Sequence, residues 1–326
     1  MNSALRPMST GEVLDRTFYL YRNNFILFAG ITLVASILSL VVRLAMLGIV
    51  GSDSLQGNSP NFSLSTFLLN MAVSWVVYLV VHSLASGATV HAVSLVHLGR
   101  SASIHQSYSE IKFLFLRIFN IVVSVFIRAV GPLIIIYALL FAIAISLTQA
   151  ARGNPASSTV IAGAFLALFL FVALLVCLVW MVRTFARYAF AVPACAIEKV
   201  SAGDALKRSK FLTKKSIGRV VLVFLLTGII ALALGYVFQL PIYLAHKSFW
   251  MTPRMHLSLP YVIGAYVADF LAGSMAGPIA TISIALLYYD EKIRKEAFDL
   301  QLMMQSLEPS AAQAATASAS DLGVIS

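Results

Sequence analysis

Six apolar stretches dominate the sequence, and each is long enough to cross a lipid bilayer as a helix. They run over about residues 25–50, 67–98, 113–147, 160–183 (with an apolar continuation to Ile197), 220–245 and 261–289. A helix needs about 20 predominantly apolar residues to span the hydrocarbon core. Several stretches exceed that length, so we expect tilt or extension beyond the membrane. The sequence therefore predicts an all-α fold, a polytopic membrane helical bundle with about six transmembrane helices.

The composition fits a membrane protein better than a soluble one. Hydrophobic residues make up 60% of the chain and charged residues only 11%, whereas about a quarter of the residues of soluble domains are charged. The net charge of +10 could suggest a nucleic-acid partner. However, the basic residues lie at the ends of apolar stretches and form no stripe interleaved with aromatic residues. We therefore expect membrane lipids as partners, and no nucleic acid.

The distribution of lysine and arginine predicts the orientation of the bundle. Of the 23 Lys and Arg residues, three lie in the alternate connections 51–65, 149–158 and 247–260, and two more, Arg43 and Arg128, lie inside apolar stretches. The remaining eighteen flank the opposite face. Because basic residues are enriched in cytoplasmic connections, this pattern places both termini in the cytoplasm.

The chain also contains an internal repeat. Residues 9–22 align with residues 201–214, and five aligned pairs are identical: Ser9/Ser201, Gly11/Gly203, Leu14/Leu206, Arg16/Arg208 and Leu20/Leu212. A fainter copy starts at Ser101. We predict a membrane domain over residues 1–306, built from three related units at about residues 9–98, 101–198 and 201–303. Residues 307–326, which are mostly small and polar, are expected to form a disordered cytoplasmic tail.

Each unit is expected to begin with an amphipathic helix that lies in the membrane interface. Ser9 and Glu12 have the spacing of a capping box, which marks a helix start. Apolar residues then recur on one face, at Leu14, Phe18, Tyr21 and Phe25. This pattern favours an interfacial helix with its basic edge toward the headgroups, and a helix packed under the bundle is the alternative. At the far end of the chain, Tyr288 and Tyr289 are expected in the headgroup belt.

Three charged residues inside the spans form the main candidate site. Asp269 lies in the sixth span, Arg43 toward the outer end of the first, and Arg128 within the third. Charges inside a membrane are costly and normally pair in the protein interior. We therefore expect Asp269 to pair with Arg43 or Arg128. Such a cluster could serve as a proton relay, an ion relay or a headgroup site, or it could be a structural ion pair.

Basic residues near the cytoplasmic ends of the spans are candidates for contacts with lipid phosphates. They could equally serve only to set the topology. These candidates are Arg16, Arg22, Arg183, Arg187, Arg208 and Lys214.

Several other residues carry weaker signals. His82 and His91 are nine residues apart, so they face opposite sides of a helix and cannot bind one metal ion. Gly273 and Gly277 form a GxxxG pattern that allows close helix packing. Proline interrupts three spans, which is typical either of tolerated kinks or of broken helices at a transport site. Cys177 and Cys195 suggest no disulfide or metal site. No catalytic residue, cofactor or metal site is predicted.

Two terminal motifs carry a resemblance to a known family. They are RPMSTGEVLDRTFYLYRNNF at residues 6–25 and LYYDEKIRKEAFDLQLM at residues 287–303. The chain resembles the membrane domain of glycerophosphoryl diester phosphodiesterases and, more loosely, six-span bacterial proteins of the YciC type. The resemblance implies a bacterial inner (plasma) membrane protein. In the enzymes, a phosphodiesterase domain with a His-Arg motif follows the membrane part.

This sequence departs from the enzymes in the catalytic part. It has no His-Arg pair, because His97 is followed by Leu98, and about twenty residues follow Met303, against roughly 250 for a catalytic barrel. We therefore expect a protein that is not an enzyme. It would be a membrane scaffold of the cell envelope, in contact with lipids. The alternative is a transporter or lipid-moving protein that uses the Arg/Asp cluster. A second copy or another membrane protein stays open as a partner.

Overall fold

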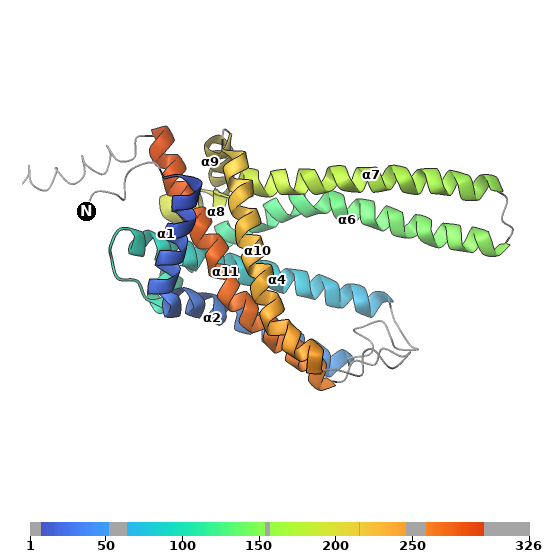
Figure 1. Cartoon of the computed structure of the whole chain (residues 1–326), viewed down its shortest axis with the longest axis horizontal. Coiled ribbons are helices and arrows are strands. Elements are labelled where there is room, and N and C mark those ends of the chain that lie inside the picture. Colours follow the sequence, from blue (N-terminus) through green and yellow to red (C-terminus); the bar gives the residue numbers. More distant parts are fainter. Residues whose placement is uncertain (1–7, 52–63, 154–156, 215, 246–258, 297–326) are drawn as a thin grey trace, which may run out of the picture.

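The computed structural model describes residues 8–51, 64–153, 157–214, 216–245 and 259–296 (Figure 1). Among these residues, six helices are long and apolar enough to cross a membrane: α2 (Phe25–Val50), α4 (Leu64–His97), α6 (Phe115–Gly153), α7 (Ser157–Tyr188), α10 (Ile217–Ala245) and α11 (Leu259–Glu296). Their bounds follow the six predicted stretches closely. The predicted all-α membrane bundle is confirmed. The predicted tail, at residues 307–326, lies outside the described residues.

The shorter helices gather at one end of the bundle (Figure 1). They are α1 (Thr10–Asn23), α5 (Ile104–Ile111), α8 (Ala191–Glu198) and α9 (Ala202–Thr213). The last turns of α11 reach the same end. We call it the charged end, since it holds the ion pairs described below. The α6–α7 hairpin diverges from the other long helices toward the opposite end (Figure 1).

A serine caps the start of three of these short helices. The hydroxyls of Ser9, Ser103 and Ser201 each accept a hydrogen bond from the backbone N–H three residues later, at 3.1–3.2 Å. Such caps satisfy N–H groups that have no partner within the helix. In α1 the capping box is complete, because Glu12 also accepts from the Ser9 backbone N–H. Helix α5 is capped at Ser103, two residues beyond the predicted start at Ser101.

Helix α1 packs into the protein through a face other than the apolar one that is predicted to lie in the interface. Val13, Thr17 and Leu20 pack into the protein, whereas Phe18 is 41% exposed and Phe25 also 41% exposed. Helix α1 packs against α11, and the Thr17 hydroxyl accepts a hydrogen bond from Ser283 at 3.1 Å. A hydroxyl side chain, not an apolar one, occupies the centre of this contact, and the placement of the opposite face in the membrane interface remains a prediction. The aromatic residues left exposed suit contact with lipid.

Helix α11 is the centre of the bundle. In its most apolar window 61% of the residues are buried inside the protein, against 6–22% for the other five long helices. It packs against α1, α2, α4 and α10. Small side chains allow this close packing: Gly277 lies beside Thr32 of α2, and a Cβ there would lie 3.4 Å from the threonine methyl. Gly273, the other glycine of the GxxxG pattern, faces open space.

Proline residues lie inside α6, α10 and α11 without breaking these helices. Because proline has no N–H, the carbonyl four residues earlier loses its helical partner. In α11, Pro278 frees the Ser274 carbonyl, and the Thr32 hydroxyl of α2 donates to it at 2.6 Å. In α6, Pro132 frees the Arg128 carbonyl, and the Trp180 indole N–H of α7 donates to it at 3.2 Å. In α6 and α11, the carbonyl that proline frees is thus hydrogen-bonded to a neighbouring helix.

Two half-buried tyrosines join the short helices to the long ones in a similar way. The Tyr21 hydroxyl of α1 donates to the Met275 carbonyl of α11 at 2.8 Å. The Tyr108 hydroxyl of α5 donates to the Ile31 carbonyl of α2 at 2.5 Å. Burial raises the pKa of both phenols to about 12, so both remain protonated donors at neutral pH.

Helix α9 stabilises the turn between α7 and α8. The Ser209 hydroxyl donates to the Arg187 carbonyl at 2.9 Å and accepts from the Phe190 N–H at 3.1 Å. Thr213 also donates to the Arg187 carbonyl, at 3.1 Å. These bonds replace the helical partners that the turn removes. The apolar continuation that we predicted for the fourth span is therefore the separate helix α8, packed across the charged end.

The bond from Thr32 to Ser274 yields a test of the proline argument. Thr32→Val removes the donor, and we expect it to lower the free energy of unfolding by about 1 kcal/mol, because a buried carbonyl loses its partner. Pro278→Ala restores a backbone N–H that can bond to Ser274. Thr32→Val should therefore cost clearly less in the Pro278→Ala background. A double-mutant cycle by denaturant titration in mixed micelles measures the difference. Equal costs in the two backgrounds would contradict this explanation.

Candidate functional site

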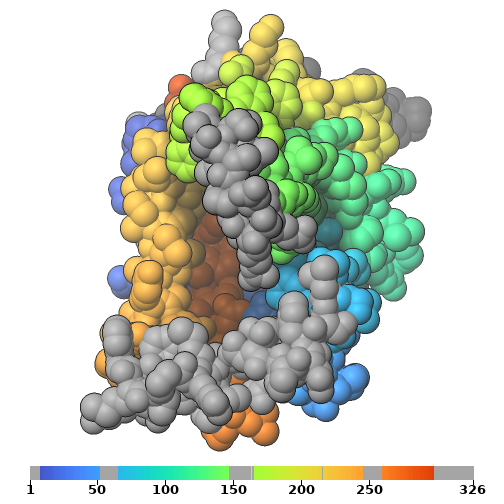
Figure 2. All heavy atoms as spheres, turned by 90° about the vertical axis from the view of Figure 1, so that its right-hand side faces the viewer, coloured from blue at the N-terminus to red at the C-terminus, as the bar shows by residue number. Residues whose placement is uncertain are grey.

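An apolar cavity of about 460 Å³ lies between the long helices. Its walls come from α4, α6, α7, α8, α10 and α11 and are mostly aromatic and aliphatic, including Trp75, Phe126, Phe185, Phe224 and Ile284. Figure 2 shows that the molecule is hollowed between α10 on one side and α4, α6 and α7 on the other, with α11 at the floor. The volume falls within the range of about 300–1,000 Å³ that is usual for small-molecule sites.

Two hydroxyls in the wall make hydrogen bonds within their own helices. The Ser86 hydroxyl donates to the His82 carbonyl at 2.6 Å, and the Thr281 hydroxyl donates to the Gly277 carbonyl at 3.4 Å. The His82 ring stacks on Tyr78 with centroids 5.8 Å apart. Sites for polar ligands need several polar groups that converge on the ligand. These walls offer mainly apolar surface, which suits a hydrocarbon chain.

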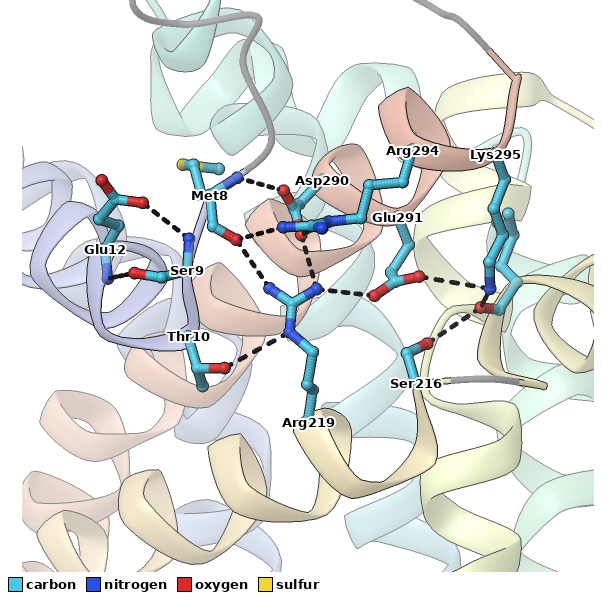
Figure 3. Close-up of polar contacts among 11 residues, drawn as sticks. Met8, Ser9, Thr10, Glu12, Ser216, Arg219, Asp290, Glu291, Arg294 and Lys295 are labelled. Carbon is cyan, nitrogen blue, oxygen red and sulfur yellow. Dashed lines mark hydrogen bonds and ion pairs between the residues drawn. The ribbon is translucent and has the colours of Figure 1, made fainter.

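A network of buried charges lies beyond the cavity on α11 and begins at Asp290, nearly two helical turns after Ile284 of the cavity wall. Figure 3 shows part of this network. The Asp290 side chain is fully buried and binds Arg219 of α10 and Arg294, both at 2.9 Å. It also accepts from the Met8 backbone N–H at 2.5 Å. Both arginines donate to the Met8 carbonyl, at 2.9 and 2.7 Å. The segment before α1 is thereby fixed to α10 and α11.

Glu291 extends this network to α9. Its carboxylate binds Arg219 at 2.9 Å and Lys295 at 3.3 Å, and the Lys295 ammonium also donates to the Leu212 carbonyl at the end of α9. Figure 3 shows that Asp290 and Glu291 both reach one nitrogen of the Arg219 guanidinium.

Glu198 forms the second half of the network, at the end of α8. Its carboxylate accepts from Lys292 at 2.6 Å, from the Tyr288 hydroxyl at 2.5 Å and from Arg208 at 3.0 Å. Arg208 of α9 also binds Glu296 at 2.6 Å. Together these bonds fix α8 and α9 against the last turns of α11.

We call these residues the charged cluster: Glu198, Arg208, Arg219, Asp290, Glu291, Lys292, Arg294, Lys295 and Glu296. The cluster contains four carboxylates and five cations, so nearly every charge is compensated. Removing one partner from a buried pair leaves an uncompensated charge, which is strongly destabilising. The cluster therefore sets the position of α8, whose residues Val192 and Pro193 close the cavity at the charged end.

Two of the three predicted intramembrane charges meet. Arg43 of α2 binds Asp269 of α11 at 2.5 Å, and the Arg43 guanidinium lies 5.8 Å from the centre of the Tyr266 ring. Arg128 does not join this pair. Its guanidinium lies 5.8 Å from the centre of the Tyr188 ring near the charged end, because a long side chain in the middle of a span can extend toward the nearer interface.

The basic residues that were predicted to contact lipid phosphates differ in how far their charged groups are free to do so. Arg208 was expected to contact headgroups, but Glu198 and Glu296 occupy its guanidinium. Arg16 is half-buried, with its guanidinium 5.4 Å from the centre of the Tyr19 ring. The others are exposed at the charged end, and their contacts with lipid remain a prediction: Arg22, Arg183, Arg187 and Lys214.

Sequence reasoning missed the charged cluster. Tyr288 and Tyr289 were expected in the headgroup belt, yet they are 0% and 4% exposed, because α1, α8 and α9 cover the end of α11. One signal could have indicated the cluster. The chain has only 13 acidic residues, and three of them, Asp290, Glu291 and Glu296, follow directly after the last span.

Of the two histidines that the sequence analysis considered as metal ligands, His82 lines the cavity. Within the described residues, no group of three or more His, Cys, Asp or Glu side chains could hold a metal ion.

The fold defines a multi-pass integral membrane protein. Residues 164–316 match the family model of the membrane domain of glycerophosphoryl diester phosphodiesterase. This match confirms the resemblance inferred from the sequence motifs, and it concerns the membrane domain, not the catalytic one. No curated protein and no solved structure matches the chain. The matched segment includes every residue of the charged cluster, together with the walls that α7, α8, α10 and α11 contribute to the cavity.

The charged cluster can be tested at its most buried carboxylate. Asp290→Asn leaves Arg219 and Arg294 undercompensated, and we expect it to lower the free energy of unfolding by about 3 kcal/mol or more. Asp204→Asn is the matched control, because Asp204 of α9 is exposed and pairs with Ser201 and Lys207 of its own turn; it should cost far less than Asp290→Asn, since exposed ion pairs contribute little to stability. Denaturant titration in mixed micelles measures both. Similar small losses would show that the network contributes little to the fold.

Proposed function

We propose that the protein is a non-enzymatic membrane scaffold of the bacterial cell envelope that holds a membrane lipid between its helices. The observation that carries this proposal is the cavity, which has apolar walls and opens between helices that a bilayer would surround. Its occupant in a membrane is most simply a lipid acyl chain, because lipid is the apolar molecule present at the highest concentration.

Two observations support a binding role over a catalytic one. The aliphatic hydroxyls of the described cavity wall, those of Ser86 and Thr281, donate to carbonyls of their own helices and not to a general base, whereas a nucleophilic hydroxyl is normally activated by an adjacent base. The family match is with a membrane domain. The charged cluster adds a structural reason, since it fixes α8 at the end of the cavity and so favours a stable site.

The orientation belongs to the same proposal. The charged end carries most of the exposed lysines and arginines, such as Arg22, Arg187, Lys207 and Lys214. By the positive-inside rule, this end would face the cytoplasm of a bacterium, with the molecule in the inner membrane. The three capped helices α1, α5 and α9, each at the start of a pair of spans, support three related units.

One observation favours the second candidate, a lipid-moving protein. The α6–α7 hairpin diverges from the other helices (Figure 1), and the hollow between it and α10 is open in Figure 2. A lipid could enter and leave through such an opening. Movement of lipid across the membrane would then distinguish this role from a scaffold.

Filling the cavity tests lipid binding. Ala280→Phe places a ring in the cavity wall on α11, and we expect the purified protein to retain roughly tenfold less phospholipid, because the added side chain occupies the acyl-chain volume. Ala144→Phe on α6 is the matched control, since Ala144 is exposed away from the cavity. Mass spectrometry of lipids retained after extensive detergent washing gives the measurement. Equal retention in both variants and the wild type would refute the proposal.

Vesicle assays separate the two candidates. A scaffold should leave the transbilayer exchange of fluorescent phospholipids at the level of protein-free vesicles. A lipid-moving protein should accelerate the exchange, and Ala280→Phe should slow it while Ala144→Phe does not. Asp269→Asn would show whether the Arg43–Asp269 pair takes part in lipid movement, because it removes the carboxylate charge and keeps the shape of the side chain.

A further inference from the structure

We infer that Arg128 and Lys210, whose charged groups both lie near the Tyr188 ring, form a headgroup site for an anionic phospholipid. The acyl chain of this lipid enters the cavity. This inference rests on the proposed lipid binding and adds the class of lipid. It assigns a ligand to residues outside the Arg43–Asp269 pair and outside the charged cluster.

The geometry brings two cations to the rim of an apolar cavity. Tyr188, the last residue of α7, lines the cavity. The Arg128 guanidinium of α6 lies 5.8 Å from the centre of its ring, and the Lys210 ammonium of α9 lies 5.4 Å from the same centre. Three helices thus converge so that an aromatic ring and two positive charges border one apolar space.

These two cations differ from the cations of the charged cluster and from Lys207 on the next turn of α9. Every cation of the charged cluster has a carboxylate within 4 Å, and Lys207 pairs with Asp204 at 3.3 Å. Within the part of the chain that the structure describes, neither Arg128 nor Lys210 has an ion pair with a carboxylate. Both side chains belong to exposed residues. A charge at a membrane span that lacks a protein partner is normally satisfied by water or by a headgroup.

An anionic phospholipid satisfies both parts of this site at once. Its phosphate can accept charge-assisted hydrogen bonds from arginine and lysine, and its acyl chain can occupy the cavity beyond Tyr188. A soluble phosphate would leave the apolar cavity unfilled. A zwitterionic lipid would bring its own positively charged group close to the two cations. The chemistry therefore favours a lipid with net negative charge, such as phosphatidylglycerol, in the leaflet at the charged end.

The test compares lipids that differ only in the headgroup. Delipidated protein in a neutral detergent is titrated with phosphatidylglycerol and with phosphatidylethanolamine, each carrying the same fluorophore on one acyl chain. We expect the wild type to bind phosphatidylglycerol roughly tenfold more tightly. The Arg128→Gln/Lys210→Gln double variant should lose this preference and bind both lipids like the wild type binds phosphatidylethanolamine.

The matched control is the Arg100→Gln/Lys112→Gln double variant. It removes one arginine and one lysine that are also exposed at the charged end, so any general effect of net charge appears in both variants. The control should keep the preference. Glycerol 1-phosphate at millimolar concentration should fail to displace the labelled phosphatidylglycerol, since it has no acyl chain.

The outcomes separate this inference from the proposed function. If the wild type binds neither lipid, lipid binding itself is refuted. If it binds both and the Arg128/Lys210 variant keeps the wild-type preference for phosphatidylglycerol, the headgroup site is refuted while lipid binding stands. Displacement by glycerol 1-phosphate would assign the cations to a soluble anion and overturn the inference. Loss of preference in this variant alone, with an unchanged melting temperature, would establish the site.

Discussion

A membrane offers no partner to a free carbonyl or a charge, and this constraint organises the whole bundle around α11. Where Pro278 frees a carbonyl, Thr32 of α2 supplies the hydrogen bond. Where α11 leaves its apolar part, Asp290 and Glu291 are paired with Arg219, Arg294 and Lys295. Several of these hydrogen bonds and ion pairs hold another helix against α11. The most buried helix is therefore also the one with many polar groups that need partners. Hydrogen bonds and ion pairs fix the orientation of neighbouring helices, which apolar contacts alone would not do in lipid.

The spans and one ion pair could be predicted from the sequence, whereas the charged cluster could not. Helices α2 and α10 match the predicted stretches almost to the residue, because length and hydropathy alone decide a span. The Arg43–Asp269 pair followed from the cost of unpaired charge in lipid. Charges after a span usually face water, so nothing local showed that Asp290 is buried. Its burial depends on α1, α8 and α9, which come from distant parts of the chain. The position of Arg128 was missed for a related reason, since a long side chain can reach an interface from within a span.

The cavity and the charged cluster belong to one arrangement. Ala280 and Ile284 line the cavity, and Tyr288, one turn later on α11, donates to Glu198 at the end of α8. Helix α8 in turn supplies the wall at Val192 and Pro193. The acyl-chain site that we propose is thus closed at one end by residues whose positions are set by ion pairs. Toward the other end, the α6–α7 hairpin leaves it accessible from the membrane.

The order of the helices along the chain has a consequence for biosynthesis. Helix α11 leaves the ribosome after the other five spans, and yet it supplies the centre against which α1, α2, α4 and α10 pack. Until it enters the membrane, the earlier spans can pack only against one another, as α6 does against α4 and α7, and Met8 has no acceptor or donor on α11. The bundle is therefore completed only after translation of the last span, when Met8, before the first helix, meets Asp290 and Arg294 in the last turns of α11. A polypeptide interrupted before α11 would lack the helix at the centre of the bundle.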